Sequence, residues 1–359
     1  MPDHTHKTGG QSPVDPSPEG RPLPAFPAEA AFENAAEATG AASAGEAENE
    51  PASSLEPRLP FARPPSAELT IRQGDLVLLL LEDGRRLTVQ AGAGPGGRRL
   101  KGTHFGQVDL EALVGLKYGH SIRTSTDHVM YLIRPTLQDH IFSLKRSTQI
   151  IYPKDIGVIL MKLGLREGSR VLECGTGSAS LTASMAWMVG PRGHVFSYDR
   201  EPLFQKNARV NLARMGLIDR VTLRLREIGA EPFDDDPIDA AFLDVREPPA
   251  LLDAVGRVLP PGGVLGMLVP TTNQICAVLE ALENRPYVDT EVLETSFRRY
   301  KVNASRLRPE DRMIGHTGYL LFTRRIEPDP DFTPVPRNKR ARRIAAQRAA
   351  AAEGEPGSR

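Results

Sequence analysis

Residues 171–181 read VLECGTGSASL and decide the fold of this 359-residue chain. The apolar residues at the start of this stretch end a predicted buried strand, and Ser178 to Leu181 open a predicted helix. Between them, Gly175 and Gly177 permit a tight turn with no Cβ in the way of a ligand. A strand, a glycine turn and a helix in this order present backbone N–H groups and a helix N-terminus to a nucleotide-type cofactor.

Two acidic residues narrow the choice of cofactor. Glu173 stands just before the turn, and Asp199 ends the next apolar run, His194 to Tyr198. An acid at the end of the second strand is suited to accept hydrogen bonds from the hydroxyls of a ribose. Glu173 suits a cationic amino group better than a pyrophosphate, which it would repel. S-adenosylmethionine (SAM) has an ammonium, a ribose and no phosphate. Because Ser180 also replaces the third glycine of the dinucleotide fingerprint, the loop favours SAM over NAD.

Composition bounds the rest of the chain. Residues 1–60 carry ten Asp and Glu against three Lys and Arg, whereas the last 29 residues carry seven Lys and Arg against three Asp and Glu. The two cysteines, Cys174 and Cys276, lie far apart and outside any CxxC pattern. A reduced, cytoplasmic protein without structural zinc is therefore expected. The sequence contains no apolar stretch of membrane-spanning length and no signal pattern at its start, so a membrane partner is not expected.

Four segments are predicted along the chain. Residues 1–65, rich in Pro, Ala and Glu, form a disordered acidic extension, because they hold too little apolar surface to join a core. Residues 66–135 form a small β-barrel-like domain that opens with a hairpin around Asp83-Gly84. Residues 136–328 form the cofactor-binding domain. Residues 329–359 form a flexible basic tail that is either an RNA-contacting arm or simply solvated.

Strands and helices alternate from Ile156 onward, which predicts a doubly wound parallel sheet with its site at the carboxyl ends of the strands. The last two segments, 288–302 and 318–324, are expected to form an antiparallel pair at one edge. That finish is typical of the class I SAM-dependent methyltransferase fold, with its Rossmann-like sheet. The predicted helices cover 156–163, 181–189, 202–215, 251–258 and 273–282, and the predicted strands cover 170–172, 194–198, 221–225, 240–243 and 264–269.

Outside the glycine loop, four residues are candidates for the chemistry. Asp244 follows an apolar strand and forms an acidic doublet with Glu247, which predicts a carboxylate beside the reactive end of the cofactor. The alternative is that Asp244 only caps the following turn, as many aspartates at strand ends do. Tyr152, followed by Pro153, offers a fixed aromatic ring that is suited to stack on a base or on the cofactor. The alternative is ordinary packing of this ring at a domain junction. His316 lies between two glycines and is more often structural than catalytic in such a setting.

Three segments taken together resemble the tRNA (adenine-N1)-methyltransferase family of the TrmI type. They are RSTQIIYPKD at 146–155, ECGTGSASL at 173–181 and GHTGYL at 315–320, with DVREP at 244–248 between them. The similarity spans about residues 70–325. The glycine loop is shared by many SAM enzymes, whereas the first and last segments are far more specific. The resemblance implies SAM-dependent methylation of N1 of adenosine 58 in the tRNA T-loop by a homotetramer.

The resemblance also assigns roles to single residues. Asp244 matches the active-site aspartate next to the cofactor, and Asp199 matches the acid that binds the ribose. Tyr152 and Glu247 are expected on the substrate side, and no metal is required. Ser180 departs from the family, in which a glycine is common at that position. The cofactor loop is matched by Glu173, Gly175, Gly177, Ser178, Ala179, Ser180 and Leu181.

The implied reaction needs little proton chemistry. Adenine N1 has an in-plane lone pair and attacks the methyl group directly, while Asp244 holds the N6 amino group and stabilises the developing positive charge. The base must first be extruded into the pocket, where Tyr152 packs against it. Two rival functions are a non-catalytic tRNA-binding subunit and another SAM enzyme, such as an isoaspartyl-protein methyltransferase. The intact glycine loop and strand-end acids argue against the first, and the β domain and GHT segment disfavour the second.

Overall fold

The computed structural model describes residues 70–94, 97–146, 148–226, 233, 237–283, 285–330, 343, 346 and 347. Contacts divide the chain into two compact units, one up to Leu144 together with Ser296–Gly315, and one made of Lys145–Thr295 with the chain from His316 onward. The predicted acidic extension and nearly all of the predicted basic tail lie outside the described residues.

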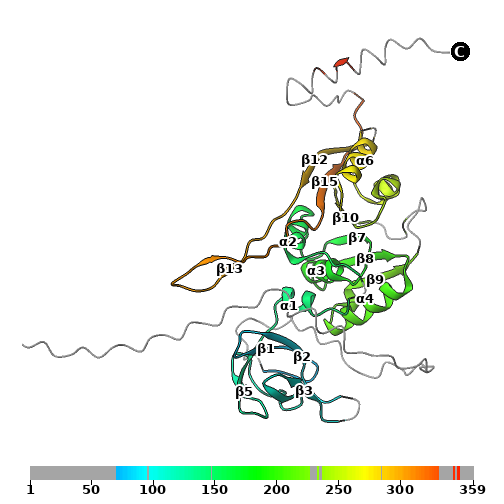
Figure 1. Ribbon diagram of the computed structural model, residues 1–359. Coiled ribbons are helices and arrows are strands. Elements are labelled where there is room, and N and C mark those ends of the chain that lie inside the picture. The colour runs from blue at the N-terminus through cyan, green and yellow to red at the C-terminus, as the bar shows by residue number, and fades with distance from the viewer. Residues whose placement is uncertain are drawn as a thin grey trace, which may run out of the picture. The chain divides into compact units, whose positions relative to one another are not determined.

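The larger unit contains a seven-stranded sheet in the order β12-β15-β11-β10-β7-β8-β9 (Figure 1). Neighbours from β11 to β9 pair in parallel, whereas β15 runs antiparallel to both β11 and β12. This confirms the doubly wound sheet and the antiparallel pair at its edge. The strands are β7 Arg170–Cys174, β8 His194–Asp199, β9 Val221–Leu225, β10 Ala240–Leu243, β11 Val264–Val269, β12 Tyr287–Leu293 and β15 Tyr319–Arg325.

Helices cover both faces of this sheet. Because side chains alternate along a strand, Leu172 and Cys174 of β7 enter one core cluster together with residues of α5 and α6. Glu173, which lies between them, points to the other face, where α3 contacts β7 and β8. The helices of this unit are α2 Pro153–Lys162, α3 Ser180–Val189, α4 Pro202–Arg214, η3 Ile218–Arg220, η4 Pro248–Leu251, α5 Leu252–Val258 and α6 Thr272–Leu282.

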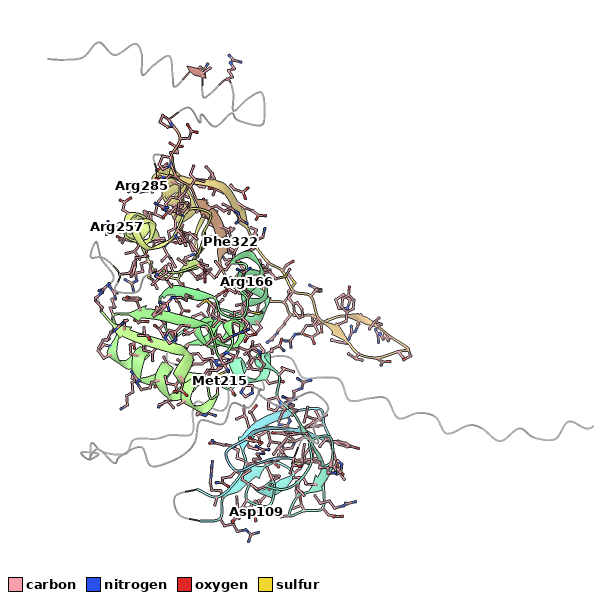
Figure 2. The ribbon with its side chains drawn as sticks, turned by 180° about the vertical axis from the view of Figure 1, so that it is seen from behind. Asp109, Arg166, Met215, Arg257, Arg285 and Phe322 are labelled. Atoms are coloured by element: carbon pink, nitrogen blue, oxygen red, sulfur yellow. The ribbon has the colours of Figure 1, made fainter. Side chains whose placement is uncertain are left out.

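The middle of the sheet is packed closely around Gly266 of β11. A Cβ at this position would lie 2.7 Å from the ring of Phe242 and 2.9 Å from the ring of Phe322. Phe322 is labelled in Figure 2. The two rings, from the neighbouring strands β10 and β15, fill the space that a side chain would need. Glycine is therefore required here by packing rather than by backbone conformation.

The structure differs from the expected elements in two places. Helix α2 begins at Pro153, three residues earlier than predicted, because proline is favoured in the first turn of a helix. The expected strand 288–302 is wrong in its second half, since β12 ends at Leu293. Residues 296–315 are mostly exposed and pair locally, β13 (Tyr300–Lys301) with β14 (Arg308–Pro309). The apolar side chains of this stretch are exposed, so no buried face holds it in the sheet.

The smaller unit is an antiparallel β domain, as expected. Its sheet has the order β2-β1-β6-β5, and β3 and β4 form a separate hairpin. The predicted hairpin around Asp83-Gly84 joins β1 and β2. The short helix α1 Leu137–Phe142 follows, with a capping box from Thr136 to Asp139. The strands are β1 Leu76–Leu81, β2 Arg86–Gln90, β3 Leu100–Thr103, β4 Gly106–Asp109, β5 Ser121–Arg123 and β6 Val129–Ile133.

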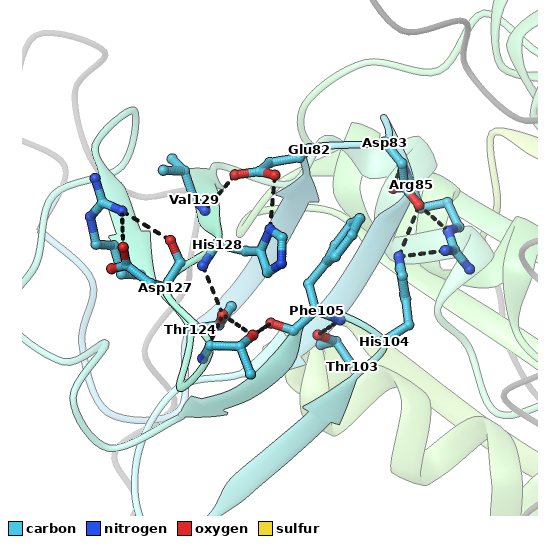
Figure 3. Close-up of polar contacts among 12 residues, drawn as sticks. Glu82, Asp83, Arg85, Thr103, His104, Phe105, Thr124, Asp127, His128 and Val129 are labelled. Atoms are coloured by element: carbon cyan, nitrogen blue, oxygen red, sulfur yellow. Dashed lines mark hydrogen bonds and ion pairs between the residues drawn. The ribbon is translucent and has the colours of Figure 1, made fainter.

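Polar contacts tie the loops of this domain together (Figure 3). The Glu82 carboxylate accepts hydrogen bonds from Val129 N at 2.8 Å and from His128 Nδ1 at 3.0 Å. The bond from His128 is the main reason that the pKa of Glu82 is lowered. The Phe105 ring lies between the rings of His104 and His128, with centroid distances of 4.0 and 4.7 Å. These contacts fix the tips of the hairpins around one aromatic cluster.

Within the described part of the chain, no helix combines the length and apolar character needed to cross a membrane.

Candidate active site

The sheet has one topological switch point, between β7 and β10. From β7 the chain proceeds outward through β8 and β9 and then returns to the other side of β7 with β10 and β11. In an open α/β sheet, a ligand binds in the crevice outside the carboxyl ends of the strands at such a point. The glycine loop follows β7, and Asp244 follows β10, so both lie at this crevice.

Gly175 brings the loop into contact with the chain after β10. Its φ of +100° is rarely adopted by residues with a side chain, and a Cβ would lie 2.2 Å from the carbonyl oxygen of Asp244. The amide of Asp244 donates to Cys174 O at 2.8 Å. The prediction that the glycine loop and Asp244 meet at one sheet edge is therefore consistent with their direct backbone contact.

Asp199 holds the loop from the other side. Its Oδ2 accepts a hydrogen bond from Gly177 N at 2.9 Å, and its Oδ1 accepts one from Glu201 N at 3.0 Å. Tyr198 O also accepts from Gly175 N at 2.8 Å. Each carboxylate oxygen keeps a lone pair for a further donor. Asp199 is thus oriented at the end of β8 with acceptor capacity left for hydroxyl groups.

Glu173, the next-to-last residue of β7, is buried. Its Oε2 accepts from Thr182 Oγ1 at 2.6 Å and from Ser197 Oγ at 2.5 Å. Because Ser197 has a single hydroxyl proton and gives it to Glu173, the 2.7 Å contact with Thr176 must run from Thr176 to Ser197. A loop hydroxyl, a strand hydroxyl and a helix hydroxyl therefore fix this carboxyl group.

The three acids lie close enough to influence one another. Burial raises the pKa of Glu173 to about 8, and the charges of Asp244 and Asp199 add to the increase. Burial raises the pKa of Asp244 to about 6, again with a contribution from Asp199. A bound cation would relieve this repulsion and favour the ionised carboxylates. The site therefore fits SAM, which carries a sulfonium and an ammonium, better than an anionic cofactor.

The remaining loop residues are closely packed. Ala179 is fully buried and has a left-handed φ of 65° at the N-cap of α3. Ser178 Oγ lies 3.0 Å from Thr148 Oγ1, so the chain before α2 contacts the loop. Ser180 and Leu181 are buried in the first turn of α3. The left-handed conformation costs a residue other than glycine about 1–2 kcal/mol, so the surrounding packing must hold Ala179 in place.

The predicted substrate-side residues lie on the flanking segments. Tyr152 is the N-cap residue of α2, half-buried, and its hydroxyl accepts from Gln149 Nε2 at 3.1 Å. Glu247 is exposed at the start of η4. The loop between Asp244 and Glu247 is held by Gln274, which donates to Arg246 O at 3.1 Å. Contact of Tyr152 and Glu247 with the substrate stays a prediction.

His316 is structural in this arrangement. Its Nδ1 lies 2.6 Å from a Glu294 carboxylate oxygen, and its Nε2 lies 2.9 Å from Pro270 O. Both partners accept hydrogen bonds only, so both ring nitrogens donate and the imidazole is cationic. The hydrogen bond to Pro270 and the one to Glu294 raise the pKa of His316 accordingly. A ring without a free lone pair is no general base.

Sequence reasoning missed the hydroxyl groups around Glu173 and the buried pair Lys154 and Asp155. Serines and threonines are too common for their pairing across 20 residues or more to be visible in one sequence. Lys154 and Asp155 were within a quoted motif, but their partner Thr317 lies about 160 residues away. The described residues contain no group of His, Cys, Asp and Glu side chains that could hold a metal ion.

The sheet order, the single reversed strand β15 and the glycine loop at the switch point define a class I SAM-dependent methyltransferase.

Comparison with known proteins specifies the family. Residues 128–314 match the family of the tRNA methyltransferase complex GCD14 subunit. The chain is 31% identical over 254 residues to the tRNA (adenine(57)-N(1)/adenine(58)-N(1))-methyltransferase TrmI of Methanocaldococcus jannaschii, a match covering 64% of this chain and 89% of that protein. The chain belongs to this family of tRNA methyltransferases, which the resemblance in its sequence had indicated.

Solved structures agree with this assignment. The tRNA (m1A58) methyltransferase TrmI from Aquifex aeolicus superposes with a TM-score of 0.62 at 32% identity, over 72% of this chain and 100% of that one. A protein from Thermotoga maritima described as a SAM-dependent O-methyltransferase gives a TM-score of 0.68 at 39% identity, over 73% of this chain and 97% of that one. Both matches support the same fold, but the two proteins are described as methylating different atoms, oxygen in one and nitrogen in the other.

Proposed function

We propose that this protein transfers the methyl group of SAM to N1 of adenosine 58 in the T-loop of tRNA. The observation that carries the proposal is Asp244, a strand-end carboxylate in backbone contact with the cofactor loop of a chain from the TrmI family. When bound, SAM supplies an electrophilic methyl group. The chain's own residues bind and orient the two reactants.

Asp199 and Asp244 have separate roles in the proposed reaction. Asp199, held by two backbone amides, accepts hydrogen bonds from the ribose hydroxyls of the cofactor. Asp244 accepts from the N6 amino group of adenine and stabilises the positive charge that develops on the ring. Because N1 attacks through its own lone pair, no residue has to remove a proton before the transfer. Alignment of N1 with the methyl group supplies much of the remaining acceleration.

Two further roles are part of the proposal. Tyr152 packs against the extruded base, and Glu247 contacts the RNA strand beside it. The buried carboxyl of Glu173 shapes the loop through Thr176 and Ser197, and we propose that the ammonium of bound SAM lowers the raised pKa of Glu173 and so favours its carboxylate form. Gly175, Gly177 and the backbone from Ser178 to Leu181 line the cofactor.

The direct test incubates the purified protein with isotopically labelled SAM and an unmodified tRNA transcript. Mass spectrometry of the digested nucleosides should find N1-methyladenosine, and a transcript with uridine at position 58 should receive no methyl group. Label found only in ribose 2′-O-methyl nucleosides would mean that oxygen rather than N1 is methylated and would refute the proposal. The Asp244→Asn variant is the control for a contaminating enzyme.

The same digest settles whether position 57 is also modified. The name of the Methanocaldococcus jannaschii relative includes adenines 57 and 58, whereas that of the Aquifex aeolicus protein includes only 58. Transcripts with adenosine at either position, or at both, separate the two specificities. We further propose a homotetramer located in the cytoplasm. Light scattering of the purified protein tests the first of these, and a fluorescent fusion tests the second.

A further inference from the structure

A buried ion pair lies at the N-terminus of α2 and contacts two distant strand ends. Asp155 is 1% exposed; its Oδ1 accepts from Lys154 Nζ at 2.9 Å, and its Oδ2 accepts from Thr317 Oγ1 at 2.7 Å. Thr295 Oγ1 also donates to Asp155. Lys154 Nζ lies 2.6 Å from Thr317 Oγ1 and 3.1 Å from Thr295 O. The donors and the carboxylate oxygens are thus mutually satisfied.

This cluster joins the two most specific segments of the sequence. Lys154 and Asp155 belong to the stretch RSTQIIYPKD, and Thr317 belongs to GHTGYL. Helix α2 also contacts β15, which begins just after Thr317 (Figure 1). The reaction as derived above assigns no role to any of these side chains. A buried ion pair is weak evidence for stability, since an apolar replacement of similar volume is often no worse.

The chain before the cluster forms a strap, residues 148–155, with an anchor at each end. At the first end, Thr148 Oγ1 lies 3.0 Å from Ser178 Oγ of the cofactor loop. At the other end stands Asp155, whose amide donates to Tyr152 O at 2.9 Å. Tyr152 is four residues from the first anchor, so its Cα is within about 14 Å of that of Thr148. The backbone that carries Tyr152 therefore runs between an anchor on the cofactor loop and the buried carboxylate of Asp155.

We infer that Asp155 is a positioning residue for Tyr152. Asp155 fixes the first turn of α2 to the ends of β12 and β15 through Thr295 and Thr317, and this turn sets the direction of the Tyr152 ring. Its effect on catalysis runs through the placement of the extruded adenine, not through contact with either reactant. The inference rests on the proposed function, because it takes Tyr152 as the residue against which the base packs.

A double-mutant cycle on the full-length protein tests this coupling. Asp155→Asn, Tyr152→Ala and the double variant are compared in single-turnover methylation of tRNA, with SAM affinity measured by calorimetry. Asp155→Asn should slow the transfer about tenfold when Tyr152 is present and less than about twofold in the Tyr152→Ala background. SAM affinity should stay within about twofold, because the cofactor contacts are untouched. Equal effects in both backgrounds, or a loss confined to SAM affinity, would overturn the inference.

Thr317→Val provides a milder variant that keeps both charges, and it replaces Asp155→Asn in the cycle if the latter does not fold. Thr323→Val is its matched control in β15, the strand that follows Thr317; Thr323 Oγ1 donates to Val288 O at 3.0 Å, away from the strap. Hydrogen exchange of peptides covering 148–156 should be faster in Thr317→Val and unchanged in Thr323→Val.

The exchange measurement needs no methyl transfer and separates the two proposals. If the wild-type protein fails to methylate tRNA, the proposed function falls, while faster exchange confined to Thr317→Val still supports the anchoring of the strap. If the wild-type protein is active but exchange is equal in the two threonine variants, the anchoring itself is wrong.

Discussion

Lowering the pH from 7 to 5 should slow methyl transfer about tenfold through the protonation of Asp244. Burial and the charge of Asp199 raise the pKa of Asp244 to about 6. The active form is the carboxylate, so activity is present above this pKa and is lost as the pH falls through it. With a pKa of about 6, roughly ten in eleven molecules are ionised at pH 7 and roughly one in eleven at pH 5.

The assay is the methylation rate between pH 5 and 8 with SAM and tRNA both well below their KM values, which reports groups of the free enzyme. The acid limb should have unit slope, and Asp244→Asn should be slow at every pH with no limb in this range. Asp239→Asn is the matched control, because Asp239 lies immediately before β10 and Asp244 lies immediately after it. The Asp239 carboxylate accepts a hydrogen bond from Arg170 N, at the end of the strand opposite to the site. A wild-type profile that is flat from pH 5 to 7, or a limb that persists in Asp244→Asn, would refute the reasoning.

Three further predictions follow from the cofactor loop and the chain ends. Asp199→Ala should weaken SAM binding tenfold to over a hundredfold, or about 1.5–3 kcal/mol, in a calorimetric titration; an unchanged Kd would place the ribose elsewhere. Gly175→Ala should abolish SAM binding and lower Tm, because its Cβ would lie 2.2 Å from a carbonyl oxygen, whereas Gly168→Ala, at a φ of +89° with open space around it, should cost only about 1 kcal/mol. Deleting residues 1–65 should leave Tm unchanged and strengthen tRNA binding at low salt, because this acidic segment joins no core and competes with RNA. Deleting residues 334–359 should flatten the salt dependence of tRNA binding. Equal slopes of log affinity against log salt in the full-length protein and in the protein without the tail would refute phosphate contacts by the tail.

The sequence predicted the sheet well because each strand is a short apolar run between glycines and prolines. The β7 to α3 turn was readable from Gly175 and Gly177, and Asp244 from its place after β10. What remained hidden depends on contacts between distant residues. Burial beneath α3 turns Glu173 toward Thr182 and Ser197, and no local pattern encodes which face of a strand a single acid will take once its neighbours are apolar on both sides.

The second half of the expected edge strand illustrates the same limit. Residues 296–315 contain apolar side chains at Phe297, Tyr300 and Val302, which favour a strand by propensity. All three are about half exposed. Propensity selected the extended conformation correctly, but it does not choose the partner, and here the partner is β14 rather than β15.

The missing side chain at Gly175 also constrains how this enzyme can change over generations. The cofactor loop at Gly175 and the turn at Asp244 are 69 positions apart in the sequence but pack directly against each other, since Gly175 lies against the carbonyl oxygen of Asp244. A substitution in either segment that shifts its backbone would displace the other. Substitutions in the cofactor loop should therefore be accompanied by compensating substitutions in the turn that begins at Asp244. Libraries that randomise only one of these two segments should yield few active clones.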